Sequence, residues 1–332
     1  MDLTKFLQTH IPQITATVLL VTYSHLRSKL TIPGILAGIA SATIHMLHPY
    51  PAFFWLLILF FLLGTLVTRI GHRAKQTLTT SSTGGAGGEG PRSAVQVVAN
   101  SGFACLLILA HTWILRNANS PFVSSHLPLS PGPSFPNLKR VLPIGVLVQY
   151  AAVAADTFSS ELGILSATTP FLITAPWRKV PRGTNGGVTM EGLMYGALGA
   201  WLLTVTAVLA LRFCSPARGE GVVGGGGGGG GMTMDARTAA LVSFMGLVGS
   251  VVDSVLGALT QVTVTDKGSG KVVEGPGGQR VLVADGSKEG GSRGVMGRDW
   301  LTNNGVNFVM AALTSGLGMG VAWVSGLSLD GR

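Results

Sequence analysis

The sequence predicts an all-α, polytopic transmembrane helix bundle of about seven or eight spans, forming a single transmembrane domain over residues 1–332. Composition is the first reason. Of the residues, 47% are hydrophobic and only 11% are charged, whereas a soluble domain carries roughly 25% charged residues. The second reason is that the hydrophobic residues gather in runs close to the ~20 residues that cross a bilayer. The lipid bilayer is therefore the expected partner.

Eight apolar runs are candidate spans. The third contains FFWLLILFFLLGTLV and is the clearest, while Pro12, Gln13 and several threonines dilute the first. Arg27 and Lys29 follow the first run and no small-residue cleavage site does, so we expect a span there, not a removed signal peptide. In chain order the runs are residues 6–24, 30–47, 53–70, 94–115, 141–165, 192–213, 239–259 and 306–324.

Four segments between the runs have the composition of flexible, solvent-exposed insertions. They are rich in Gly, Ser, Pro or Lys and hold too few apolar residues to fold alone. The glycine tract 224–231 lacks the Lys-Ser/Thr that ends a phosphate-binding P-loop, so we interpret it as a linker. The segments are 77–90, 121–136, 216–236 and 266–298.

The charges indicate a topology and not a nucleic-acid partner. The net charge is +9, but the basic residues are dispersed in the short segments between apolar runs, where topology signals lie. With eight spans, 15 of the 23 Lys and Arg fall on one side, which the positive-inside rule assigns to the cytosol, with both termini opposite. Long loops count weakly in that rule, and without 266–298 the bias falls to 9 against 8. Its best support is local, from Arg69, Arg73 and Lys75 after the strongest span.

Two carboxylates stand at the end of the fifth apolar run, within AADTFSSELG. At mid-depth each would cost about 2.5–3.5 kcal/mol on insertion scales, which makes an intramembrane acid a functional candidate. Asp156 and Glu161 lie about 140° apart around a regular helix. Ligating one ion together would therefore require a helix break or a partner helix.

A glycine-rich turn, VPRGTNGGVT over residues 180–189, precedes the sixth run. Its glycines allow positive φ and close backbone approach, and a helix N-terminus follows, where N–H groups can bind an anion. Carboxylates that hold Mg²⁺ and a nearby turn that holds phosphates are what metal-bound phosphate chemistry needs. A purely structural turn, with basic topology anchors and carboxylates that pair with neighbouring helices, fits the same residues. The turn residues are Gly183, Thr184, Asn185, Gly186 and Gly187, with Lys179 and Arg182 beside them.

A weak internal repeat links the two halves. GSVVDSVLG around Asp253 is similar to the segment around Asp156, and TNNGVN at 302–307 is similar to TNGGVT at 184–189. A duplicated half-site would place a site between the halves, although Gly- and Val-rich sequence can match by chance. The spacings Gly34/Gly38, Gly192/Gly196 and Gly316/Gly320 suit close helix packing.

These motifs, in order, resemble those of transmembrane protein 19 and its relatives. They are AADTFSSELGIL, PFLIT, VPRGTNGGVTMEG, VGSVVDSVLGALTQ and NNGVNF, preceded by PRSAVQVVANSG, which is similar to that family's glutamine/asparagine motif. The resemblance covers most of residues 30–324. The chain departs from the family in its long insertions and in having Ser101 where relatives commonly run Asn-Gly directly.

The resemblance implies a multi-pass membrane protein with kinase-like, isoprenoid chemistry. Plant and cyanobacterial relatives include phytyl-phosphate kinase, and the motifs are distantly similar to those of lipid kinases that use a nucleoside triphosphate and Mg²⁺. It implies an isoprenyl-phosphate substrate held by an apolar groove between spans. By resemblance, Asp156, Glu161 and Asp253 are metal ligands, the turn 183–187 holds phosphates, Lys179 and Arg182 offset charge, and Asn100 and Asn307 orient the substrate phosphate.

Two other functions fit the same sequence. A transporter would use the acids as a cation or proton path, and a non-catalytic membrane scaffold would need them only for packing. The N-terminus is not the Arg- and Ser-rich stretch of a transit peptide. The expected location is therefore an endomembrane such as the endoplasmic reticulum.

Overall fold

Each of the eight apolar runs forms a helix. The structure, a computed structural model, describes residues 3–82, 90–117, 138–214, 232–275, 281 and 293–329. Two short helices, α1 (Leu3–Thr9) and α5 (His72–Leu78), accompany them. The eight are α2 (Ile11–Leu26), α3 (Ile32–Met46), α4 (Ala52–Arg69), α6 (Ala94–Arg116), α8 (Leu138–Gly163), α9 (Met190–Phe213), α10 (Ala236–Thr260) and α11 (Asn303–Val324).

Six of these helices are long and apolar enough to cross a membrane, by length and composition: α4, α6, α8, α9, α10 and α11. Helix α3 is apolar but has only 15 residues. Helix α2 has 16 residues, short of the ~20 that cross a bilayer, and it contains the Pro12 and Gln13 that weaken its run. Of the predicted seven or eight spans, the described residues therefore support six and a shorter seventh.

The all-α prediction is wrong in one respect, because two small sheets are present. One has the strand order β1-β6-β5-β7, with β1 (Thr80–Ser81) parallel to β6 (Val272–Glu274), and β5 (Val262–Asp266) antiparallel to β6 and to β7 (Arg293–Gly297). The other has the order β3-β2-β4, from Ala175–Lys179, Phe171–Leu172 and Gly187–Val188, all antiparallel.

Two of the segments predicted to be flexible insertions contribute strands to the larger sheet. Residues 77–90 supply β1, and 266–298 supply β6 and β7. These residues form strands because the sheet contains β-branched residues that become buried. Val264, Val272 and Val273 are all buried, and β-branched residues favour strands. Of the other two segments, 121–136 lies outside the described residues, as does 216–236 apart from its last five positions.

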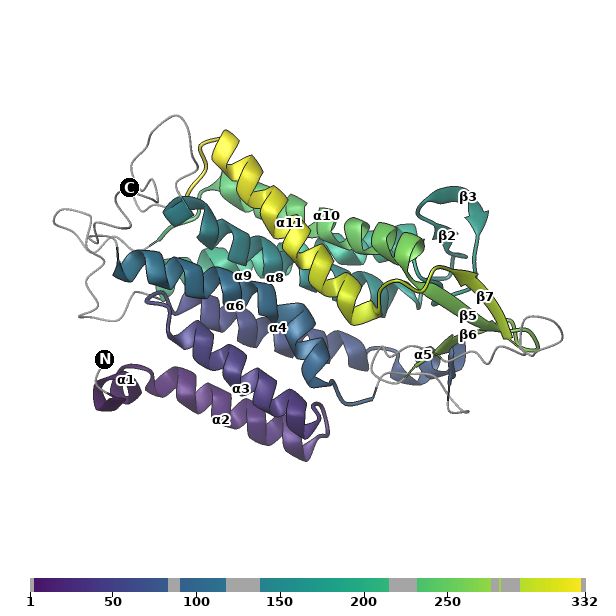
Figure 1. Ribbon diagram of the computed structural model, residues 1–332, viewed down its shortest axis with the longest axis horizontal. Helices are drawn as coiled ribbons and strands as arrows, with labels where there is room; N and C mark the ends of the chain where they lie inside the picture. Colours follow the sequence, from purple (N-terminus) through teal and green to yellow (C-terminus); the bar gives the residue numbers. More distant parts are fainter. Residues whose placement is uncertain are drawn as a thin grey trace.

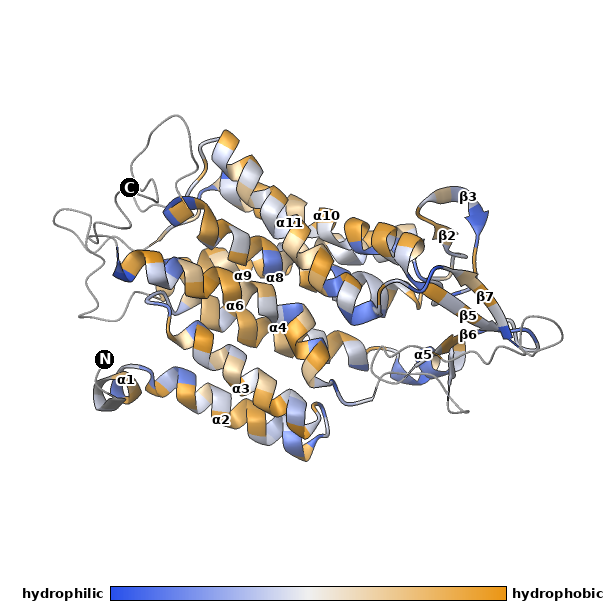
Figure 2. Ribbon diagram, viewed as in Figure 1, coloured by the Kyte–Doolittle hydropathy of each residue, from blue (hydrophilic) through white to orange (hydrophobic). Residues whose placement is uncertain are grey.

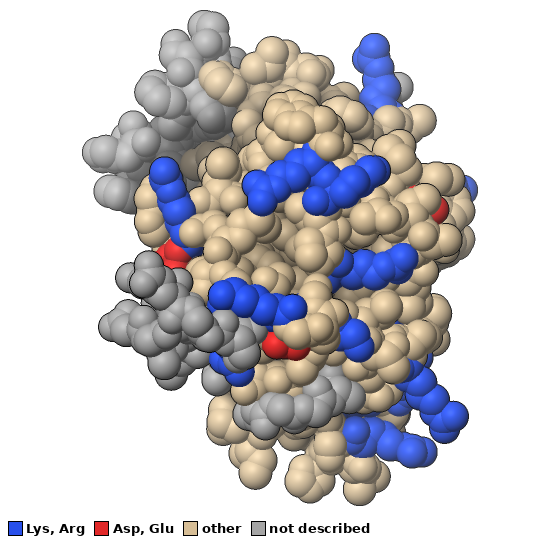
Figure 3. Space-filling view, turned by 90° about the vertical axis from the view of Figure 1, so that its right-hand side faces the viewer, with Lys and Arg blue, Asp and Glu red and all other residues tan. Residues whose placement is uncertain are grey.

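Both sheets lie at one end of the bundle and both chain termini at the other (Figure 1). The connections α2–α3, α4–α6, α8–α9 and α10–α11 all lie at the sheet end, because successive helices run in opposite directions. That end collects the basic segments which the sequence places on one side, and Figure 3, which looks onto it, shows many Lys and Arg side chains there. Figure 2 shows hydrophobic residues along the long helices and a hydrophilic first turn of α11 at the same end.

Helix α8 is the centre of the bundle, with 89% of its spanning window buried inside the protein. Its alanines permit close approach by glycines of α9 and α10. A Cβ at Gly249 would lie 2.5 Å from the Cβ of Ala152, and one at Gly199 would lie 2.8 Å from the carbonyl oxygen of Ala154. Helix packing in lipid depends on such close contacts, since no hydrophobic effect drives helices together there.

These contacts make a testable contrast between two helical glycines. Gly249→Ala should destabilise the protein by about 1–3 kcal/mol, the usual cost of overpacking. Gly316→Ala should be neutral or slightly stabilising, because a Cβ there meets nothing within 4 Å and Ala is the better helix former. Thermal unfolding in detergent measures both, and equal effects would contradict the packing.

Only part of the predicted GxxxG packing is found within the described chain. Gly34 and Gly192 lie against other backbone, and a Cβ at Gly196 would lie 3.2 Å from the carbonyl oxygen of Ala155. Added Cβ atoms at Gly38, Gly316 and Gly320 would meet nothing within 4 Å. The spacing alone therefore does not identify a close contact, because it also occurs at glycines where an added Cβ would meet no other atom.

Candidate functional site

A polar cavity of about 420 Å³ opens at the sheet end of the bundle. Its walls come from α4, α5, α6, α8, α9, α10 and α11, from the turn before β4, and from the larger sheet. The volume lies in the range of small-molecule sites. The predicted site residues that line it are Asn100, Asp156, Glu161, Arg182, Gly183, Thr184, Asn185, Gly186, Gly187, Asp253 and Asn307.

Lys179 is the predicted site residue that the structure does not bring to the cavity. It lies on the exposed strand β3, with its ammonium nitrogen 5.8 Å from the centroid of the Phe171 ring. A neighbouring cation of the turn, Arg182, does line the cavity. Its guanidinium, however, donates hydrogen bonds to the carbonyl oxygens of Ile164 (2.9 Å) and Ser166. Arg182 therefore holds the loop that follows α8.

The carboxyl groups of Asp156 and Asp253 meet inside the bundle. Asp156 follows Ala152 by one helical turn on α8, and Asp253 follows Gly249 by one turn on α10. Residues four apart share a helix face, so the close Ala152–Gly249 contact directs both carboxyl groups toward the same space. The two carboxyl groups lie close enough to interact electrostatically, and both line the cavity.

An asparagine of a third helix completes this pair. With its amide nitrogen directed at the acceptors, Asn307 of α11 donates to Oδ2 of Asp253 at 3.2 Å and to the carbonyl oxygen of Asn303 at 2.9 Å. Three separate helices thus hold the polar groups in place. The partner helix that ligation by Asp156 would require is therefore α10, and no break in α8 is needed.

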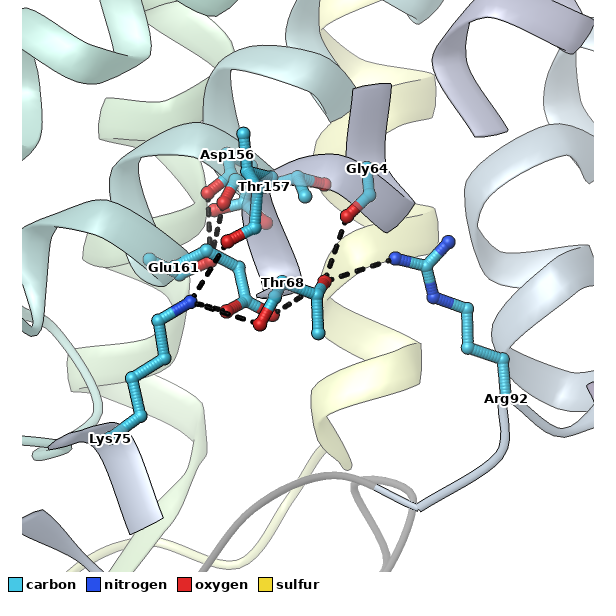
Figure 4. A network of polar contacts seen from close by, with 9 residues as sticks. Gly64, Thr68, Lys75, Arg92, Asp156, Thr157 and Glu161 are labelled. Carbon is cyan, nitrogen blue, oxygen red and sulfur yellow. Dashed lines mark hydrogen bonds and ion pairs between the residues drawn. The ribbon is translucent and has the colours of Figure 1, made fainter. Parts of the chain in front are cut away.

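Glu161 lies on the cavity wall in a network of polar side chains that also includes Asp156 (Figure 4). Lys75 of α5 forms an ion pair with its Oε2 at 2.5 Å, and Thr68 of α4 donates to its Oε1 at 3.1 Å. Arg92, just before α6, donates to the Thr68 hydroxyl at 3.5 Å. Lys75 also donates to the carbonyl oxygen of Val67 at 3.0 Å, so the ion pair fastens the end of α4 to α8.

The three predicted metal-binding acids do not form one group of ligands, and Glu161 is paired with Lys75. Among the described residues there is no group of three or more His, Cys, Asp and Glu that could hold a metal ion. Asp156 and Asp253 nevertheless suit Mg²⁺, which is usually held by one or two carboxylates, waters and substrate phosphates. The donor set fits the ion, with Glu161 occupied by Lys75.

The glycine turn lies directly against α10, next to Asp253. Gly183 and Gly186 have φ values of 83° and 76°, a region that favours glycine. A Cβ at Gly186 would lie 2.4 Å from the Cβ of Ala258 and 2.7 Å from the carbonyl oxygen of Ser254. Glycine is therefore required here for two reasons, the backbone conformation and the contact with α10.

Most described amide groups of this turn are satisfied by the protein itself. The N–H of Thr184 donates to Pro181, that of Asn185 to the Thr263 hydroxyl at 3.1 Å, and that of Gly187 to Thr184 at 2.8 Å. The Thr184 hydroxyl is buried without a hydrogen-bond partner in the described structure, and Thr184 lines the cavity. The turn is therefore a fixed part of the cavity wall that offers one unpaired hydroxyl group. It is not a loop of free amide groups that could surround an anion.

Helix N-termini supply further positive potential. Helices α6, α9 and α11 begin at the cavity, and their first turns line it through Gln96, Gly192 and Asn304. Helix N-termini carry partial positive charge and favour anions. Each is capped by the side chain of its own N-cap residue, Ser93 for α6, Thr189 for α9 and Thr302 for α11.

Sequence reasoning missed several cavity residues. The sequence marks Lys75 only as a topology signal and gives no role to Thr68, Arg92, Asn303 or Asn304, yet all five line the cavity. A usable signal exists for the two cations. Lys75 follows one span and Arg92 precedes the next, on the same side of the membrane as the helix ends that carry the acids.

The predicted internal repeat holds for the acids and fails for the turns. Asp156 and Asp253 occupy comparable places near the ends of α8 and α10. Thr302 is the N-cap of α11, whereas its sequence match Thr184 lies in the turn well before α9, which Thr189 caps. The similarity of the two TNG sequences is therefore not a structural equivalence.

The Lys75–Glu161 pair predicts a large stability effect. The two side chains are only 11% and 18% exposed, so Lys75→Met leaves a carboxylate without its cation in a poorly hydrated wall. Breaking a buried pair costs about 3–5 kcal/mol, and partial exposure places this one near 3 kcal/mol. Thermal unfolding in detergent should show the loss for the single variant and substantial recovery when Glu161→Gln is added. An unchanged single variant would contradict the contact.

Fold and site together define an integral, multi-pass membrane protein with a polar cavity at one end of its helix bundle. The chain belongs to the family of integral membrane protein DUF92, the transmembrane protein 19 family, whose pattern matches residues 15–315. Protein PGR of Arabidopsis thaliana is 30% identical over 292 residues, 88% of each chain.

Two further relatives cover less of the chain. An uncharacterized membrane protein of Methanocaldococcus jannaschii is 30% identical over 217 residues, 63% of this chain and 76% of that one. Protein VTE6, chloroplastic, of Arabidopsis thaliana is 27% identical over 183 residues, 54% of this chain and 48% of that one. No solved structure matches the chain.

Proposed function

We propose that this protein transfers a phosphoryl group from a nucleoside triphosphate to an isoprenyl monophosphate at the membrane surface. The observation that carries the proposal is the Asp156–Asp253 pair, which faces a cavity that is also lined by Lys75 and Arg92. Paired carboxylates and nearby cations are the parts that phosphoryl transfer uses. The family resemblance, which includes phytyl-phosphate kinase among plant relatives, points to the same reaction.

Asp156 and Asp253 would hold Mg²⁺, with Asn307 fixing the Asp253 carboxylate. The ion would neutralise charge on the phosphate oxygens. The Thr184 hydroxyl, buried and without a protein partner in the described chain, is available to donate to a phosphate oxygen. The carboxylate pair and the Thr184 hydroxyl would act mainly by positioning the phosphates and stabilising their charge, the dominant contributions in phosphoryl transfer.

The reaction balances without a general base. An oxygen of the lipid monophosphate attacks the γ-phosphorus, the bond from that phosphorus to the β–γ bridging oxygen breaks, and a lipid diphosphate and a nucleoside diphosphate form. A phosphate monoester has a second pKa near ~6, so the attacking group is already a dianion at neutral pH. Glu161, which is paired with Lys75, is therefore not needed as a proton acceptor.

Location follows from where the nucleotide is available. The basic segments gather at the cavity end, and basic loops face the cytosol in most membrane proteins. We therefore place the cavity on the cytosolic side of an endomembrane such as the endoplasmic reticulum.

The test is phosphoryl transfer by the purified full-length protein in detergent. The panel contains an isoprenyl alcohol and an isoprenyl monophosphate, each of the four nucleoside triphosphates, and Mg²⁺. We expect lipid diphosphate from the monophosphate and no product from the alcohol. No product across the panel from folded, monodisperse protein would overturn the proposal.

Transport is the second candidate, because paired carboxyl groups in spanning helices also suit a cation path. Flux through liposomes in the absence of nucleotide would favour it. Nucleotide-dependent product without flux would favour the transferase.

A further inference from the structure

A second cavity lies next to the polar one. It is an apolar groove of about 100 Å³ between α2, α3, α4 and α6. Its apolar wall includes Leu20, Ile35, Leu57, Ile58, Phe61 and Val97. Phe60, Arg92, Gln96 and Asn100 line both cavities, so the groove and the polar cavity are adjacent at these residues.

The groove is too small to enclose a whole lipid. Pockets that enclose a drug-sized ligand measure roughly 300–1,000 Å³, several times its volume. It can hold one stretch of a single chain, with the remainder of the chain in the surrounding bilayer. Gly38 lines the groove, and an added Cβ there would meet nothing within 4 Å.

Arg92 stands where the two cavities meet, and its backbone is firmly placed. Its N–H donates to the carbonyl oxygen of Lys29 at 3.0 Å, and its carbonyl oxygen accepts from the N–H of Thr31 at 3.0 Å. The guanidinium extends toward α4, where a Cβ at Gly64 would lie 3.2 Å from it. In the described part of the chain, Lys75–Glu161 is the ion pair found, so Arg92 has no carboxylate partner there.

Positive charge accumulates around this junction. Burial lowers the pKa of Lys29 below its ordinary value, and repulsion from Arg69 and Arg92 adds to the effect. Cations that repel each other next to a groove are complementary to an anion. A guanidinium is suited to phosphate in particular, because its planar fork can donate two parallel hydrogen bonds.

We infer that the groove between α2, α3, α4 and α6 admits the single apolar chain of a lipid monophosphate from the bilayer, with its phosphate held at Arg92. This inference rests on the proposed function and assigns the two substrates to opposite walls. The lipid phosphate lies toward α6, beside Gln96 and Asn100. The nucleotide lies toward the glycine turn and the larger sheet, across the Asp156–Asp253 pair.

The test is photocrosslinking to the full-length protein in lipid nanodiscs, without nucleotide. The probe is a C20 isoprenyl monophosphate that carries a diazirine midway along its chain. We expect crosslinks at groove residues of α2, α3, α4 and α6, competed by unlabelled isoprenyl monophosphate. Crosslinks confined to other helices, or competition by phosphatidic acid or inorganic phosphate as strong as by the isoprenyl monophosphate, would overturn the inference.

Two variants sharpen the result. Gly38→Phe fills the groove and should weaken labelling about 10-fold or more, whereas Gly316→Phe, at an equally open helical glycine, should label like the wild type. Arg92→Gln should weaken competition by the monophosphate on the order of 10–100-fold, the loss of a charge-assisted contact, while competition by the alcohol stays unchanged. Melting temperatures check that each variant is folded.

Binding and transfer can fail separately. Groove labelling that depends on Gly38 and Arg92, with no product in the transfer panel, would sustain the lipid site and reject the kinase reaction. Transfer by Gly38→Phe with an unchanged KM for the lipid would sustain the reaction and reject the groove.

Discussion

Asp156→Asn and Asp253→Asn should each reduce phosphoryl transfer by about 10²–10⁴-fold, because a bound metal ion contributes several kcal/mol to the stabilisation of transition-state charge. Each carboxylate is one of the two that the structure brings together. Initial rates of lipid diphosphate formation at saturating Mg²⁺ measure the effect. Asp235→Asn is the matched control, since it makes the same change on α10 at the opposite end, where Asn still caps the helix.

The same variants should behave differently in a stability measurement. Two carboxyl groups in contact disfavour each other's ionisation, so Asp253→Asn should unfold at the wild-type temperature or higher when Mg²⁺ is absent. Added Mg²⁺ should raise the melting temperature of the wild type, since a ligand that binds the native state stabilises it, and should leave the variant unchanged. A variant that still gains stability from Mg²⁺ would place the ion elsewhere.

Gly186→Ala should destabilise the protein by about 2–5 kcal/mol. Positive φ costs a non-glycine residue roughly 1–2 kcal/mol, and overpacking against Ala258 and Ser254 adds about 1–3 kcal/mol. The clash would push the turn away from α10 beside Asp253, so transfer should fall as well. Thermal unfolding and initial rates measure the two effects.

Gly270→Ala separates these two causes. Gly270 has a φ of 69°, and a Cβ there meets nothing within 4 Å. It should lose only the conformational part, about 1–2 kcal/mol, and keep full transfer activity. Equal losses for the two variants would show that the contact with α10 is unimportant.

The sequence predicts the helices well because their signal is local. A run such as FFWLLILFF must avoid water whatever its neighbours are, and all eight runs form helices. The strands escaped prediction because they are two to five residues long and separated by Gly- and Lys-rich sequence. Val272 and Val273 become a strand only when β5 lies beside them, and that pairing cannot be read from a short window.

The candidate site, like the fold, could be predicted only in part from the sequence. Chemistry-bearing residues could be selected from the sequence because acids in apolar runs are rare, and most of those selected line one cavity. Their partners could not be selected, since Lys75 and Glu161 are 86 positions apart. Which carboxyl groups face one another also depends on helix rotation, which the contact between Ala152 and Gly249 sets.

The central position of α8 has a consequence for how the protein is made. This helix carries Asp156 and Glu161 and is covered by α9, α10 and α11, all of which are synthesised after it. An unpaired acid in a spanning helix opposes membrane insertion, by up to about 2.5–3.5 kcal/mol at mid-depth. A nascent chain that stops before α10 therefore leaves Asp156 without its counterpart and the small-residue faces of α8 uncovered. Biogenesis should make this helix depend on the C-terminal half, so that truncated products remain recognisable to membrane quality control.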